Sequence, residues 1–149
     1  MDFTKLTQGE RIVLIAGFLL IVDLLLFPWH KFPGPLGLVP YGPSSTGIQS
    51  PGAFWGVVAL LVTLVMVAHI VATKLANATL PDIPVPWGQV HLIAGCTVFG
   101  LLLIKLVAET DYTAYGAYLG VLLAAALAFG GFTVSKEAAA TGGGRLPPL

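Results

Sequence analysis

The stretch Ala53–Thr73 reads AFWGVVALLVTLVMVAHIVAT and contains no aspartate, glutamate, lysine or arginine. A helix of about 20 apolar residues is long enough to cross the hydrocarbon core of a bilayer. Three further runs are predominantly apolar and of similar length, so four segments are predicted to span a membrane. We expect an all-α fold, a polytopic four-helix transmembrane bundle within residues 1–135, and a flexible cytoplasmic tail at 136–149. The expected spans are residues 11–28, 53–74, 87–108 and 115–134.

Composition supports this fold class. Charged residues make up 9% of the chain, against about 25% in ordinary soluble domains. Seven basic and seven acidic residues cancel, so the chain offers no basic face for nucleic acid, and the lipid bilayer is the expected partner. Cys96 is the single cysteine, which excludes an intramolecular disulfide.

The first apolar run has a second interpretation. Lys5 and Arg11 precede it, as basic residues precede the apolar core of a signal peptide. No small-residue cleavage site follows, because the next residues are FPWHKFPGP at 27–35. We therefore expect this run to be a retained first span.

Basic residues predict the orientation, because cytoplasmic loops carry an excess of lysine and arginine. If the amino terminus is cytoplasmic, five basic residues lie inside and two lie toward the outside. We therefore expect a plasma-membrane protein with both termini in the cytoplasm. The inner set is Lys5, Arg11, Lys74, Lys136 and Arg145, and the outer set is Lys31 and Lys105.

The first outer connection, about Pro28–Pro51, is dense in proline and glycine. Such a segment forms neither a long helix nor a central strand. We expect it to fold as a compact cap on the outer mouth of the bundle.

Two ionisable side chains interrupt the first and third runs. Asp23 lies about one turn below the outer boundary at Pro28, and Lys105 lies at a comparable depth below Asp111. Because an unpaired charge in lipid is costly, we expect an ion pair between Asp23 and Lys105, with Glu109 as a second acceptor. Alternatively, Lys105 extends to the interface and Asp23 faces polar loop atoms or is protonated. The role expected of the ion pair is in packing and helix register, rather than a proton pathway.

Two histidines are expected at matched depth near the inner side. His69 precedes Lys74 at the end of the second span, and His91 follows Trp87 at the start of the third. Facing imidazoles can ligate haem iron or help bind a metal, so this pair is the candidate haem, metal or ligand site. The alternative is two interfacial histidines hydrogen-bonded to backbone or water, with no cofactor, and we favour it.

The fourth span carries small residues at a four-residue step, Gly116, Gly120 and Ala124. Such a stripe lets another helix approach closely in lipid. The partner helix can belong to this chain or to a second copy, and the internal one is expected, with Gly95 and Gly100 as the complementary notch.

Motifs of enzymes are missing from the sequence, which has no HExxH, no GxSxG and no phosphate-binding glycine loop. We therefore expect a non-enzymatic membrane protein, an accessory subunit or scaffold that packs against a larger membrane protein or a second copy. The alternative is a small transport or redox component that uses His69 and His91.

Three stretches carry a resemblance to a known group. They are LLLFPWHKF at 24–32, PGAFWGVVALL at 51–61 and YGAYLGVLLAAALAFGGF at 115–132. Together with the proline- and glycine-rich outer loop, they resemble the small four-span membrane proteins of unassigned function that are common in actinobacteria. The resemblance implies a four-span fold and implies no catalytic residue.

Overall fold

The computed structural model describes residues 3–33, 43–50, 52–76, 78–79 and 84–140 of the 149-residue chain. Most of these residues are helical. A short 3-10 helix, η1, precedes the first long helix, and a short π-helix, η3, extends the second. The elements are η1 (Phe3–Lys5), α1 (Gln8–Leu26), β1 (Pro28–Lys31), β2 (Ser44–Thr46), α2 (Ala53–Ile70), η3 (Val71–Leu75), α3 (Trp87–Ala108) and α4 (Tyr115–Ala140).

Helix α1 begins and ends on clear sequence signals. The Thr7 hydroxyl accepts a hydrogen bond from the Glu10 amide at 3.3 Å, and the Glu10 carboxylate accepts one from the Thr7 amide at 2.9 Å. This reciprocal capping box satisfies two amides that an α-helix leaves without partners at its start. The helix ends before Pro28, since a proline disfavours helical backbone in the residue that precedes it.

Gly52 starts α2 in a left-handed conformation, with φ of 69°. A side chain there would be strained, and its Cβ would also lie 3.4 Å from the Lys105 amino group. The glycine therefore allows the connection from the cap to turn into the helix directly beside α3.

Helix α3 has the predicted bounds, and α4 is longer than predicted. The predicted flexible tail begins at residue 136, yet the helix continues through residues 136–140. Lysine, glutamate and alanine in SKEAAA favour helix, and Glu137 contacts the start of α1. The rest of the predicted tail lies outside the described residues.

Among the residues that the structure describes, three helical segments are long and apolar enough to cross a membrane, Ala53–Leu75, Trp87–Ala108 and Tyr115–Ala140. Helix α1 is 19 residues long and includes three charged residues, Glu10, Arg11 and Asp23.

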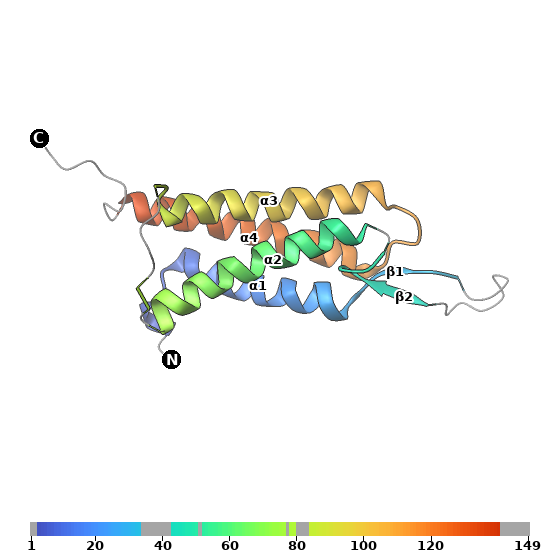
Figure 1. Cartoon of the computed structure of the whole chain (residues 1–149), viewed down its shortest axis with the longest axis horizontal. Coiled ribbons are helices and arrows are strands. Elements are labelled where there is room, and N and C mark those ends of the chain that lie inside the picture. The colour runs from blue at the N-terminus through green and yellow to red at the C-terminus, as the bar shows by residue number, and fades with distance from the viewer. Residues whose placement is uncertain (1–2, 34–42, 51, 77, 80–83, 141–149) are drawn as a thin grey trace, which may run out of the picture.

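The four helices run alternately up and down (Figure 1). Helix α4 packs closely against both α3 and α1, and α2 makes less extensive contacts with α3 and α1. Helices α1 and α3 are therefore diagonal partners across the bundle. The start of α1 and the end of α4 lie at one end, and β1 and β2 lie at the other (Figure 1).

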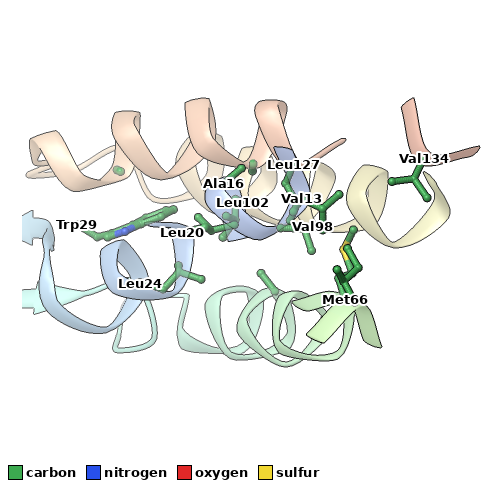
Figure 2. Packing of buried hydrophobic residues seen from close by; sticks show 14 of the residues in the cluster. Val13, Ala16, Leu20, Leu24, Trp29, Met66, Val98, Leu102, Leu127 and Val134 are labelled. Atoms are coloured by element: carbon green, nitrogen blue, oxygen red, sulfur yellow. The ribbon is translucent and has the colours of Figure 1, made fainter. Parts of the chain in front are cut away.

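A single apolar cluster fills the space between the helices (Figure 2). Trp29 lies at the capped end of this cluster and Val134 lies toward the opposite end (Figure 2). Val13, Leu20, Leu24, Val98, Leu102 and Leu127 are fully buried between them.

The outer connection forms a two-stranded antiparallel ribbon in its described parts. His30 pairs with Ser45 and Lys31 with Ser44, and the pairing is irregular between Pro28 and His30. The ribbon is anchored to the bundle because the Ala114 amide donates to the Trp29 carbonyl at 2.7 Å. Residues 34–42 and 51 of the expected cap lie outside the described residues.

The small residues of α4 face the interior of the bundle. A Cβ on Gly116 would clash with the Pro28 carbonyl, and one on Gly120 would clash with the Trp29 ring. Ala124 is fully buried. On α3, a Cβ on Gly95 would lie 2.9 Å from the Cα of Ala128, so α3 and α4 are in backbone contact there.

Candidate functional site

A polar cluster is buried at the end of the bundle that the β1–β2 ribbon covers. The Trp29 indole Nε1–H donates to Asp23 Oδ2 at 2.8 Å, and Lys105 Nζ lies 5.7 Å from the centroid of the Trp29 ring. All three side chains are completely buried. The Lys105 amino group also donates to the Gln49 carbonyl at 3.3 Å. One indole therefore contacts both the buried carboxyl group and the buried amino group.

This geometry differs from the expected direct ion pair of Asp23 with Lys105. The ion pair found among the described residues, with nitrogen and oxygen at most 4.0 Å apart, is Lys74 with Glu10. The reason for the difference is the buried Trp29 indole, which contacts both Asp23 and Lys105. Glu109, the expected second acceptor, ends α3, and its backbone carbonyl lies 3.1 Å from His30 Nε2.

Trp29 itself is a residue whose role the sequence did not reveal. An aromatic residue beside a span boundary is typical of the membrane interface, where its ring is partly exposed. Here the ring is 0% exposed. Asp23 could have predicted this role of Trp29, because a buried carboxyl group needs a nearby hydrogen-bond donor and the indole N–H is one.

The cap also buries His30 and Ser45, which pair across the ribbon. His30 Nδ1 and Ser45 Oγ are buried and have no hydrogen-bond partner among the described residues. Oδ1 of Asp23 shares this property. The end of the bundle next to the β1–β2 ribbon therefore holds three buried polar atoms that have no hydrogen-bond partner within the described part of the chain.

His69 and His91 meet at the other end of the bundle. Nδ1 of His69 and Nε2 of His91 are 2.9 Å apart, which is hydrogen-bond distance. The Trp87 ring stacks on His69 with centroids 4.1 Å apart. In such a pair one imidazole donates and the other accepts, so at least the accepting ring is neutral.

A cavity of about 230 Å³ between α2 and α3 is bordered by both histidines. Nδ1 of His91 is buried without a hydrogen-bond partner among the described residues. The other lining residues are Leu61, Val62, Val65, Met66, Trp87, Val90 and Ala94.

The contact limits how the two rings can hold a metal. Bonds of about 2.0–2.1 Å place two ligand nitrogens on opposite sides of a metal about 4 Å apart. His69 and His91 would have to separate to admit an iron between them. Within the residues that the structure describes, no group of three or more histidine, cysteine, aspartate or glutamate side chains is close enough to hold a metal ion. Cys96 is exposed on α3.

The end of the bundle opposite the β1–β2 ribbon carries a further polar set that the sequence did not indicate. Glu10 is nearly buried, and its Oε1 lies 3.4 Å from Lys74 Nζ. The Gly9 amide donates to the Glu137 carboxylate at 3.1 Å, so a side chain of α4 caps the start of α1. These contacts join α1 to η3 and to α4.

No family model matches this chain. No curated protein and no solved structure matches it either. The resemblance to small four-span actinobacterial proteins therefore stays a prediction, and any function has to be argued from the geometry above.

Proposed function

We propose that the chain is a multi-pass plasma-membrane protein whose four long helices, α1 included, all span the bilayer. Helix α1 lies within the same bundle as the three strongly apolar helices and runs antiparallel to α2. Two of its charged residues, Glu10 and Asp23, are buried with partners inside the bundle, which favours placing this helix in lipid. Only Arg11 remains exposed, at the first turn.

The proposed orientation has both termini in the cytoplasm. The described basic residues at the end that holds the start of α1 are Lys5, Arg11, Lys74 and Lys136, and Lys31 and Lys105 lie at the capped end. An excess of basic residues on one side favours the cytoplasm for that side.

Its proposed role is that of a non-enzymatic accessory subunit or scaffold. The observation that supports this role is an open glycine on α3. A Cβ on Gly100 would meet no atom within 4 Å, whereas the other described glycines all have near neighbours. Cys96 and Thr97, one turn earlier, are exposed. A small, open surface on a membrane-spanning helix allows a second helix to approach closely.

Gentle purification of the tagged protein from its native membrane, with mass spectrometry of the co-purifying polypeptides, tests this role. We expect a stoichiometric membrane partner with the wild-type chain and its loss with Gly100→Leu. Thermal stability should be unchanged by Gly100→Leu, because the new side chain enters open space.

The matched control is Ala68→Leu, the same kind of small-to-large change at an exposed position of α2. It should retain the partner. A wild-type preparation without a stoichiometric partner would contradict the accessory role. A partner retained by Gly100→Leu would place the contact elsewhere on the bundle.

A second candidate function is a small transport or redox component that uses His69 and His91. The observation that favours it is the apolar cavity lined by both histidines, of which His91 has a buried Nδ1 with no hydrogen-bond partner among the described residues. This candidate predicts a haem absorption band or a bound metal in the purified wild-type protein. Either signal should be lost in His91→Ala. A colourless, metal-free preparation on elemental analysis contradicts the cofactor form of this candidate.

A further inference from the structure

Charged side chains lie at the inner end of the bundle, where α1 begins and α4 ends. Both described carboxylates at this end already have a partner. Glu10 pairs with Lys74 at 3.4 Å, and Glu137 accepts from the Gly9 amide at 3.1 Å. Arg11, by contrast, is exposed, and no carboxylate of the described residues lies within 4.0 Å of its guanidinium. A fixed positive charge therefore remains uncompensated by these groups at the first turn of α1.

A hollow lies beside this charge. It has a volume of about 400 Å³ and is lined by η1 and the first turns of α1. Thr4 and Arg11 form its polar part, and Leu6, Leu14 and Ile15 form its apolar part. The hollow therefore combines a cationic group and a hydrocarbon wall within one space.

The apolar wall continues along α1 toward the middle of the bundle. Arg11, Ile15 and Phe18 share one helix face, since they are spaced by three or four residues. Ile15 is 64% exposed and Phe18 is 62% exposed. The distance from Arg11 to Phe18 along the axis is about 10 Å at 1.5 Å per residue. A ligand with an anionic head and a hydrocarbon chain would match this arrangement, in which the basic Arg11 is followed along the helix by the apolar Ile15 and Phe18.

We propose that the hollow between η1 and α1 binds an anionic phospholipid, with its phosphate on Arg11 and an acyl chain along Ile15 and Phe18. A guanidinium can donate two parallel hydrogen bonds to phosphate oxygens. Lys5 is exposed in η1 and adds positive charge on the same side. An acyl chain on Ile15 and Phe18 distinguishes a lipid from free phosphate, which would contact Arg11 alone.

Native mass spectrometry of the full chain in a maltoside detergent provides the test. Phosphatidylglycerol and phosphatidylcholine with identical acyl chains are titrated separately. We expect phosphatidylglycerol to bind more tightly, with an affinity that falls as salt rises. Arg11→Gln should weaken it about fivefold, the factor that corresponds to about 1 kcal/mol per basic residue at a membrane surface.

The matched control is Lys136→Gln, which removes the same charge at the same end of the bundle, where Lys136 lies 4.7 Å from the Phe132 ring centroid. Its affinity for phosphatidylglycerol should stay close to wild type. Circular dichroism should show unchanged helix content in Arg11→Gln, since Arg11 is exposed.

Three results would overturn the proposal. Equal affinity for the two lipids would show that the headgroup charge does not contribute to binding. Equal loss in Arg11→Gln and Lys136→Gln would show a general charge effect and no site. Displacement of the lipid by millimolar inorganic phosphate would identify a free-anion site.

Discussion

Trp29→Ala is expected to lower the free energy of unfolding by about 3–5 kcal/mol, the range for removing a large buried aromatic side chain. The ring is completely buried, and its contacts join α1, the cap and α3. The Asp23 carboxyl group would lose its donor, and Lys105 would lose the ring beside it. Reversible unfolding of the purified protein in mixed micelles, followed by circular dichroism, measures this change.

Two variants separate packing from hydrogen bonding at this position. Trp29→Phe keeps an aromatic ring but removes the donor, and should cost about 1–3 kcal/mol because Asp23 Oδ2 is left buried without its partner. Phe54→Ala is the control, since Phe54 is 67% exposed and should matter little. A loss in Trp29→Ala no greater than that in Phe54→Ala would contradict the described outer cluster.

Gly131→Val is expected to destabilise the bundle by about 3 kcal/mol or more, at the upper end of the range for overpacking. A Cβ at this position would clash with the backbone carbonyl of His91. Backbone cannot rotate away as a side chain can, so α3 and α4 would have to separate. Thermal unfolding in detergent should show the loss, and the His69–His91 contact should be disturbed.

Gly100→Val is the matched control for this prediction. It makes the same chemical change on α3, at a glycine with no atom within 4 Å of the Cβ position. Its melting temperature should match that of the wild type. Equal melting temperatures for the two variants would mean that α3 and α4 do not approach as closely at Gly131 as described.

The helices were predictable because their signal is local. A long run of predominantly apolar residues indicates a membrane-spanning helix, and Pro86 and Pro28 favour helix boundaries at these positions. The predicted bounds of α3 agree with the structure for this reason. Residues 136–140 were assigned to the tail because their charged residues end the apolar run, although alanine, lysine and glutamate continue a helix readily.

The candidate sites were predictable only in part. Depth within the helices brings His69 and His91 to one level, and the structure places their ring nitrogens 2.9 Å apart. The positions of Asp23 and Lys105 along their helices also predict that they lie at the same level. These positions do not indicate which side chain lies between the two groups. Trp29 lies in a strand whose pairing is irregular between Pro28 and His30 and whose partners are more than ten positions away. Helical periodicity does not encode such a contact.

The hydrogen bond from Gly9 to Glu137 links positions that are 128 residues apart. Chains fold from the amino terminus as they are synthesised, so α1 exists long before its cap on α4 has been made. The contacts between α1 and α4, which complete the ring of four helices, can form only when the last helix has arrived. The contact between the first and last helices is therefore expected to form last, and a chain interrupted before Glu137 would lack the carboxylate that accepts from the Gly9 amide.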